Sequence, residues 1–235
     1  MQIGQLVGSG RTADVFAIDD ERVLRRYRDG TDATMEAAVM AYLVDQGFPV
    51  PRVWPSPVDN DPAARGDLVL ERLTGQTMVR AMMEGTLSAE RTGQLLADLL
   101  YRLHAIPARR STDPTHRIRH LDLHPDNVIL TPRGPVVIDW SNTSEGLPGL
   151  DWATSALILA QVAVGGIAGT QEVAPAAGAV LHVLLAHGDR VDLGDGSTGH
   201  LAEARAIRAA NPTLTPDEIE LLDDAVALVL AARPG

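Results

Sequence analysis

The residues best suited to chemistry lie in two short segments near the middle of the chain. The first runs from His120 to Leu130 (HLDLHPDNVIL) and passes from polar residues into an apolar stretch. In the second, Asp139 directly follows the apolar residues 136–138. Burying an isolated carboxylate at the end of a strand is costly. A bound divalent cation is one way to compensate that charge, which makes Asp139 a candidate metal ligand.

The neighbouring polar residues suggest how such a site would be divided. Mg²⁺ binds one or two protein carboxylates together with phosphate oxygens. Asn127 offers a neutral oxygen close to Asp139 in the sequence, and Asp122 precedes Asn127 by five residues. That spacing allows Asp122 to face a substrate instead of the metal. The two segments therefore supply a candidate base and a split metal site.

The N-terminal third of the chain must position part of this chemistry on β-strands. Alternating and apolar runs bounded by turn residues predict strands and a hairpin, and apolar spacing predicts one helix. The predicted strands cover residues 2–7, 13–18, 22–27 and 67–73, and the helix covers 32–46, with Met35, Val39, Met40 and Leu43 on its apolar face. We expect this strand-rich lobe to end at residue 73.

From residue 74 onward the pattern is helical, apart from a small hairpin at 128–130 and 136–138. Ser88 is the expected N-cap of a long helix. The predicted helices cover residues 77–84, 88–106, 149–166, 171–187, 199–210 and 215–232. The uncharged stretch 152–171 contains glycines and a glutamine, which lower its tendency to enter a membrane. We interpret it as a buried core helix.

The segment HLDLHPDN at 120–127, followed by VVIDW at 136–140, resembles the catalytic and metal-binding loops of the aminoglycoside phosphotransferase and choline-kinase-like family. The resemblance extends from Ile3 to Leu159. It implies an α+β, protein-kinase-like fold of two lobes. The N-terminal lobe would be an antiparallel sheet with one helix that binds the nucleotide, at 1–73. The C-terminal lobe would be mainly helical, at 74–235, and carry the catalytic loop and the acceptor site.

The resemblance also assigns roles in the central segments. Asp122 would accept or orient the proton of the attacking hydroxyl. Asn127 and Asp139 would hold Mg²⁺ against the phosphates of ATP or GTP, and catalysis would rest mainly on positioning and charge stabilisation. His124 is typical of the family loop, and we expect it to bond loop backbone rather than to act chemically.

In the N-terminal lobe the resemblance holds with one departure. Gly8, Ser9 and Gly10 would form the loop over the phosphates, where glycine permits close backbone approach. The third strand should deliver a lysine, but Arg25 stands there, with Glu36 as its expected partner. Arg25 could substitute for lysine or could mark weakened nucleotide binding. Alternatively, both residues could be solvated surface charges.

Two further assignments come from the resemblance. Backbone groups of Glu71 and Leu73 would meet the edge of the nucleotide base. Asp151 would stabilise the catalytic loop, as in relatives, or would simply be an acidic residue favoured near a helix N-terminus.

Composition excludes several classes of function. All 20 basic residues are arginine, cysteine is absent, and the formal net charge is −11. These counts exclude disulfides, cysteine nucleophiles and Schiff-base chemistry. They also argue against nucleic-acid binding, which depends on basic residues that neutralise phosphates. The N-terminus has no signal-peptide pattern, so we expect a cytoplasmic protein without a membrane segment.

The expected activity is phosphate transfer from ATP or GTP to a hydroxyl of a metabolite or antibiotic. The segment between Asp139 and Asp151 is short and lacks the longer activation segment of a protein kinase. Nine acidic residues after residue 185 could line a pocket for a cationic acceptor, but we favour the interpretation that they form solvated helix faces. Two alternatives stay open, namely a non-catalytic module of the same fold and a serine/threonine protein kinase.

Overall fold

The computed structural model of this chain describes residues 3–54, 65–165, 167, 169–188 and 191–234. It contains two compact units. The first comprises residues 1–75 together with 129–141, and the second comprises 76–128 together with 142–235. These units differ from the predicted division at residue 73 because the hairpin at 129–141 belongs with the N-terminal part. Gln2, Gly166 and Asp189, which the sequence-based expectations include, lie outside the described residues.

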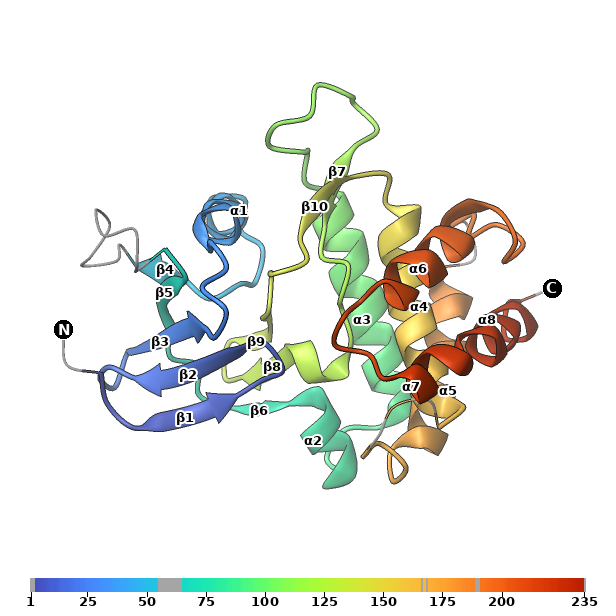
Figure 1. Ribbon diagram of the computed structural model, residues 1–235, viewed down its shortest axis with the longest axis horizontal. Helices are drawn as coiled ribbons and strands as arrows, with labels where there is room; N and C mark the ends of the chain where they lie inside the picture. The colour runs from blue at the N-terminus through green and yellow to red at the C-terminus, as the bar shows by residue number, and fades with distance from the viewer. Residues whose placement is uncertain (1–2, 55–64, 166, 168, 189–190, 235) are drawn as a thin grey trace. The chain divides into compact units, whose positions relative to one another are not determined.

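The first unit is built on an antiparallel five-stranded sheet (Figure 1). Its strand order is β1-β2-β3-β5-β4, and its central strands pair with β2 Phe16 opposite β3 Leu24, and Leu24 opposite β5 Val69. The strands are β1 Leu6–Ser9, β2 Ala13–Ala17, β3 Arg22–Tyr27, β4 Val53–Trp54 and β5 Asp67–Glu71. Strand β4 was not expected from the sequence, whereas β2, β3 and β5 lie where it predicts strands.

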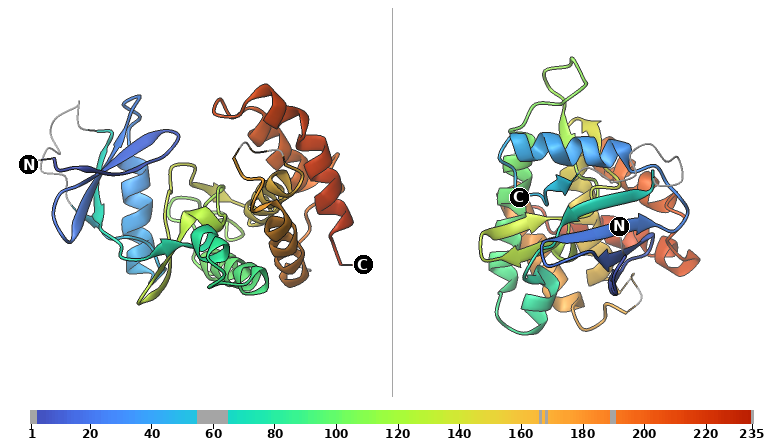
Figure 2. Two further views of the ribbon diagram at one scale, coloured as in Figure 1. Left: turned by 90° about the horizontal axis from the view of Figure 1, so that it is seen from below. Right: turned by 90° about the vertical axis from the view of Figure 1, so that its left-hand side faces the viewer.

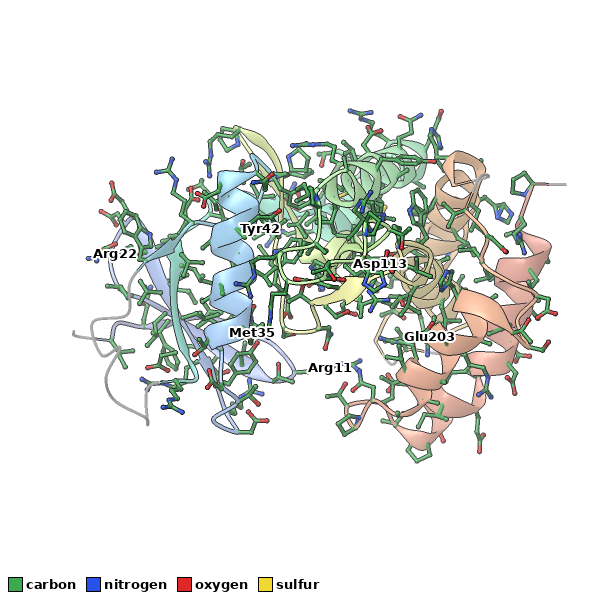
Figure 3. All side chains as sticks on the ribbon, turned by 90° about the horizontal axis from the view of Figure 1, so that it is seen from above. Arg11, Arg22, Met35, Tyr42, Asp113 and Glu203 are labelled. Atoms are coloured by element: carbon green, nitrogen blue, oxygen red, sulfur yellow. The ribbon has the colours of Figure 1, made fainter. Side chains whose placement is uncertain are left out.

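Helix α1 (Thr34–Asp45) lies against this sheet (Figure 2). Val39, Met40 and Leu43 are buried, as their helical spacing predicts. Met35, placed on the same face in the sequence analysis, is instead 49% exposed at the beginning of the helix (Figure 3). The neighbouring residue Glu36 is the one that is buried.

The hairpin of β8 (Val128–Thr131) and β9 (Gly134–Val137) is joined to the first unit by specific contacts. The backbone N–H of Val137 donates to the carbonyl of Pro49 at 2.9 Å. The fully buried ring of Trp140 packs edge-on against Phe48, with 5.8 Å between ring centroids. Asp139 lies between Val137 and Trp140, so these contacts fix its position.

The second unit is mainly helical, and α4 is its central element. Helix α4 packs against α5, α6 and α8, and α3 packs against α5. The helices are α2 Met78–Met83, α3 Ala89–His104, α4 Gly149–Ala163, α5 Ala174–His187, α6 Gly199–Ala209, α7 Pro216–Glu220 and α8 Leu222–Ala231, and the remaining short strands are β6 Gln76–Thr77, β7 Arg117–Arg119 and β10 Ser144–Gly146. Almost every residue of α4 is buried, so its lack of charge reflects a core position.

Several local features agree with the sequence and a few do not. Ser88 caps α3 by accepting from the N–H of Arg91 at 3.1 Å, as predicted. The helix predicted over 215–232 is two helices that meet at Leu221. Strands β7 and β10 pair with each other, and neither was among the predicted strands. Among the described residues, no helix is both long enough and apolar enough to cross a bilayer.

Candidate active site

Asp151, in the first turn of α4, anchors the loop that carries Asp122. Asp151 is fully buried, and its carboxylate accepts from the backbone N–H of His120 at 2.9 Å and of Leu121 at 2.7 Å. Leu121 has a left-handed φ of 62°, which is unfavourable for a residue with a Cβ. The two hydrogen bonds therefore hold a backbone turn that the local sequence does not favour.

These contacts support the first interpretation of Asp151. Its carboxylate accepts hydrogen bonds from the backbone of His120 and Leu121, so Asp151 anchors the loop from a position in the first turn of α4. Burial disfavours its charge, but hydrogen bonding and charge from His104, whose Nε2 is 2.9 Å away, and the contribution of His120 lower the pKa of Asp151 below its ordinary value. Asp151 is thus ionised at neutral pH. Its buried negative charge is stabilised by the hydrogen bonds it accepts and by the neighbouring histidines.

Asp122 projects from this anchored loop with a partly exposed side chain, at 22%. Its backbone N–H donates to Nδ1 of His120 at 3.2 Å. Nδ2 of Asn127 donates to its backbone carbonyl at 2.9 Å and lies 3.3 Å from its carboxylate. The backbone of Asp122 is therefore fixed on both sides, while its carboxylate still reaches solvent.

His124 supports the loop, as expected. It is the N-cap of the short 3₁₀ helix Pro125–Asn127, and its Nδ1 accepts from the N–H of Asp126 at 3.3 Å. Its Nε2 lies 3.2 Å from Nδ2 of Asn127. Burial lowers the pKa of His124 below its usual value, which keeps the ring neutral and able to accept a hydrogen bond at neutral pH.

Asn127 has the donor atom that a hard cation needs. Within the described part of the chain, the hydrogen bonds of its side chain all involve Nδ2. Those bonds orient the amide and leave Oδ1 as a neutral oxygen ligand. Oxygen ligands of this kind suit Mg²⁺, so the residue fits the role predicted for it in the second unit.

The first unit contains a buried charge cluster around Arg25 of β3. Arg25 points inward and is 8% exposed, whereas Arg26 is exposed and pairs with Asp67, as strand alternation predicts. Nη1 of Arg25 donates to the carboxylate of Glu36, so the pairing expected between them is present. Nη2 of Arg25 donates to Oδ1 of Asp139 at 2.7 Å.

Tyr27 completes this cluster, and the sequence analysis did not identify it. Its hydroxyl donates to Oε2 of Glu36 at 2.5 Å, and the Arg25 guanidinium lies 4.7 Å from its ring centroid. Tyr27 is two residues after Arg25 on the same strand, so strand periodicity could have placed both on one face. Burial shows that Arg25 and Glu36 are not solvated surface charges, which excludes that alternative.

The cluster changes the titration of its members. Burial opposes the charge of Arg25, but the carboxylates of Asp139 and Glu36 outweigh it and raise the pKa of the guanidinium. Burial raises the pKa of Glu36, and Arg25 and Tyr27 only partly offset that effect. A permanent cation is therefore held between two acidic side chains.

Asp139 sits at a backbone turn directly after β9. Its φ is 61°, in the left-handed region that aspartate tolerates better than most residues. Oδ1 also accepts from the hydroxyl of Ser141 at 2.9 Å, and the side chain is 36% exposed. Part of the carboxylate therefore remains accessible, which fits a hard metal ligand of the predicted kind.

The glycine-containing loop differs in extent from the predicted one. Gly8 and Ser9 belong to β1, so the turn itself begins at Gly10. The Ser9 hydroxyl donates to Asp14 at 2.7 Å and accepts from Arg28. Arg28 also donates to the carbonyl of Gly10 at 3.0 Å. Arg28 thus holds the loop by donating to the Ser9 hydroxyl and the Gly10 carbonyl. These contacts fix the shape of the loop without a bound phosphate.

Glu71 and Leu73, the two residues expected at the nucleotide base, differ in their backbone environment. The N–H of Glu71 donates to the carbonyl of Arg52 at 2.9 Å, so it is not available to a base. Leu73 follows β5, and within the described residues its backbone groups make no hydrogen bond. The contact with a base is consequently better suited to Leu73.

The structure adds one residue that the sequence analysis did not single out. Arg208 of α6 is buried, and its Nη1 lies 3.8 Å from Oδ1 of Asp122. Its Nε donates to Oε1 of the buried Gln161 at 2.8 Å. No motif links Arg208 to Asp122, because their proximity depends on how α6 packs against α4.

The chain was compared with models of known protein families. The model of the phosphotransferase enzyme family (APH) matches residues 3–121 and 108–186. The chain belongs to this family. It is therefore a phosphotransferase enzyme. No curated protein matches the chain in sequence.

Solved structures share the APH fold across nearly the whole chain. A gentamicin complex of APH(2″)-IIa aligns at a TM-score of 0.57 and 14% identity, covering 97% of this chain and 91% of that one. A putative aminoglycoside phosphotransferase from Ralstonia eutropha JMP134 gives 0.55 and 14%, covering 97% and 92%. The amicoumacin kinase hAmiN, in complex with AMP-PNP, Ca²⁺ and Ami, gives 0.54 and 13%, covering 98% and 89%. The predicted α+β, protein-kinase-like fold is confirmed.

Proposed function

We propose that this phosphotransferase moves the γ-phosphate of ATP or GTP to a hydroxyl group of a small metabolite or antibiotic, with Asp122 as the base. The observation that carries the proposal is the anchored loop. Asp151 holds the turn at Leu121 through two backbone hydrogen bonds, and the loop presents a carboxylate that is still accessible at Asp122. A general base must be both fixed and reachable by its substrate.

Asn127 and Asp139 are the proposed ligands of Mg²⁺. Each offers an oxygen donor, and a carboxylate with a neutral amide oxygen suits this ion. When bound, Mg²⁺ neutralises charge on the phosphates. Arg25, whose two terminal nitrogens donate to Glu36 and Asp139, would add a permanent positive charge beside the same phosphates.

The remaining nucleotide contacts are assigned to the first unit. The backbone of Gly8, Ser9 and Gly10 is proposed to cover the phosphates, and Leu73 is proposed to meet the base by its free backbone groups. Glu71 contributes indirectly, because its carboxylate accepts from the N–H of Arg52 at 3.2 Å and from the side chain of Arg133. It therefore ties the end of β5 to the β8–β9 hairpin.

The acceptor is proposed to be a small molecule and not a protein. Between Asp139 and α4 the chain is short and includes β10, which is paired with β7. There is no room in this connection for a long activation segment. The gentamicin complex of APH(2″)-IIa and the hAmiN complex with Ami are named for small-molecule ligands, in agreement with this choice.

The decisive test compares the wild type with Asp122→Asn and with Asp126→Asn, in which the altered carboxylate is exposed and only four residues away. Nucleotide consumption is measured with Mg²⁺ and a panel of hydroxylated acceptors, and nucleotide affinity is measured in parallel. We expect Asp122→Asn to lose acceptor-dependent turnover by at least about 100-fold while nucleotide affinity is retained. Wild-type turnover in Asp122→Asn would show that Asp122 is not the base.

A further inference from the structure

The turn between β1 and β2, residues 10–12, which Figure 3 marks at Arg11, is held by one residue directly after β3. Nη2 of Arg28 donates to the carbonyl of Gly10 at 3.0 Å, and its Nη1 donates to the carbonyl of Arg11 at 3.1 Å. The backbone N–H of Arg28 donates to the carbonyl of Thr12 at 3.0 Å. Three successive carbonyls of the turn are therefore bound by Arg28.

The direction of these carbonyls determines where the N–H of Thr12 points. In a planar trans peptide unit the N–H and the carbonyl point in opposite directions, and no peptide bond among the described residues is cis. The N–H of Thr12 shares a peptide unit with the carbonyl of Arg11, so it points away from the Arg28 guanidinium. Within the described part of the chain this N–H donates to no acceptor, and Thr12 is exposed.

The guanidinium of Arg28 is itself committed to protein acceptors. Its Nε donates to Oδ2 of Asp14 at 3.0 Å, and its Nη2 lies 2.5 Å from Oδ1 of Asp14 and 2.6 Å from Oγ of Ser9. The Ser9 hydroxyl donates to Oδ1 of Asp14 at 2.7 Å. The hydrogen bonds from Arg28 and Ser9 lower the pKa of Asp14 to about 2, so Asp14 is ionised at neutral pH. Each guanidinium nitrogen of Arg28 thus has an acceptor in the protein.

We infer that Arg28 is a positioning residue of the nucleotide site, which keeps the carbonyls of residues 10–12 away from the phosphates and directs the N–H of Thr12 toward them. This inference rests on the proposed function, in which the neighbouring residues 8–10 cover the phosphates. A backbone N–H forms strong hydrogen bonds with anionic oxygens, whereas a carbonyl oxygen turned toward a phosphate would repel it. A turn that is already ordered also avoids the cost of ordering a loop when the ligand binds.

An equivalent ion pair at the other end of β3 provides a matched control. Nε and Nη2 of Arg22 donate to Oδ2 of Asp19 at 2.8 and 2.6 Å. The Arg22 and Asp19 side chains are 42% and 39% exposed, compared with 45% and 26% for Arg28 and Asp14. The two pairs are similar in strand and geometry, but only Arg28 binds the turn at residues 10–12.

The test measures the Kd of ATP or GTP with Mg²⁺, whichever the wild type binds, and the Kd of the corresponding nucleoside. Arg28→Gln removes the guanidinium, and Arg28→Lys keeps the charge without the planar fork. Asp14→Asn weakens the support of the guanidinium, and Arg22→Gln is the control. Thr12→Pro removes the N–H, whereas Thr12→Ala retains it. Calorimetric titration gives each Kd, and thermal unfolding without ligand shows that each variant folds.

We expect Arg28→Gln to raise the Kd of the magnesium–nucleotide complex at least about tenfold, the effect of losing one hydrogen bond to a charged group. The Kd of the nucleoside should not change, because it has no phosphates. Arg28→Lys should recover part of the loss, since an ammonium lacks the planar fork of donors. Asp14→Asn should act in the same direction by a smaller factor. Thr12→Pro should resemble Arg28→Gln, and Thr12→Ala and Arg22→Gln should bind as the wild type does.

Three results would overturn the inference. They are wild-type nucleotide affinity in Arg28→Gln, an equal weakening of nucleoside and nucleotide binding in that variant, and an equal weakening of nucleotide binding in Arg22→Gln. If Arg28→Gln does not fold, wild-type nucleotide affinity in Asp14→Asn has the same meaning as the first result. Absence of Mg²⁺-dependent nucleotide binding in the wild type is different, because it would remove the proposed function itself.

Discussion

Nη2 of Arg25 lies 2.7 Å from Oδ1 of Asp139, although the two residues are 114 positions apart in the chain. The same guanidinium donates to Glu36 on α1 through its other terminal nitrogen. One arginine therefore joins β3, α1 and the turn after β9 in the first unit. This contact places a permanent positive charge on the carboxylate that we propose as a metal ligand.

Removing this cation is predicted to destabilise the protein. Arg25→Met leaves Glu36 buried without its charged partner, and breaking a buried ion pair in this way costs about 3–5 kcal/mol. Arg26→Met is the matched control, because its side chain is exposed and its ion pair with Asp67 is worth at most about 1 kcal/mol. Urea unfolding of both variants measures the difference. Equal losses of stability would contradict the role assigned to the cluster.

The metal assignment predicts a specific effect of Asp139→Asn. The variant loses the carboxylate proposed to bind Mg²⁺, so the Mg²⁺ concentration needed for half-maximal nucleotide binding should rise at least about tenfold, equivalent to 1.4 kcal/mol. A magnesium titration of the nucleotide-induced melting shift measures this. Asp126→Asn, next to the other proposed ligand Asn127, should titrate as the wild type does. An unchanged magnesium requirement in Asp139→Asn would reject Asp139 as a ligand.

Asp151 is predicted to stabilise the fold in a pH-dependent manner. Its pKa is lowered in the folded protein. The ionised group therefore contributes stability above its unfolded pKa of about 3.9, and that contribution is lost as pH falls through the lower, folded pKa. Asp151→Asn should cost about 3 kcal/mol near pH 7, where it breaks a buried network.

The stability cost of Asp151→Asn should also depend on pH. The difference between wild type and Asp151→Asn should be constant from pH 7 to about 5 and should shrink below about pH 4. Asp98→Asn, at an exposed position on α3, serves as the control and should change little. Urea unfolding across this pH range is the measurement. A difference that grows as the pH falls would have the wrong sign for a lowered pKa.

The fold was predictable where side-chain periodicity follows burial. The inward position of Arg25 and the outward position of Arg26 follow from strand alternation. Met35 was misplaced because helical spacing alone cannot tell which of two adjacent residues at the beginning of α1 faces the sheet. The buried residue is Glu36, whose charge is compensated by Arg25, and that compensation depends on tertiary structure.

Only those residues of the candidate site that belong to a sequence motif could be predicted from the sequence. Asp122, Asn127 and Asp139 stand in one recognisable pattern, whereas Arg208 has no local signature and reaches Asp122 through helix packing. The anchoring role of Asp151 was undecided from sequence, since an acid in the first turn of a helix is favourable in any case. Strands β7 and β10 were missed because they are short and rich in polar residues.

Substitutions of His124 can distinguish a structural role in the loop from a direct role in the reaction. His124→Ala removes the side chain that caps the 3₁₀ helix, so we expect a loss of about 1 kcal/mol in stability and a lower kcat as the loop loosens. His124→Asn can still cap, because asparagine is a favoured N-cap residue, and should recover much of both. Thermal unfolding and turnover are measured together. Full recovery of stability without any recovery of turnover would indicate that the imidazole itself takes part in the reaction.

The central claim is that this chain binds a magnesium–nucleotide complex for phosphate transfer. It is tested most directly by the melting midpoint with Mg²⁺ and ATP and with Mg²⁺ and GTP, each compared with nucleotide and chelator. A ligand that binds the folded state raises the midpoint, and a concentration 100 times Kd adds about 2.7 kcal/mol. We predict a rise with at least one nucleotide that requires Mg²⁺ and disappears in Asp139→Asn. No rise with either nucleotide at millimolar concentration would contradict the proposed nucleotide site, with Arg25 in place of lysine as the first feature to re-examine.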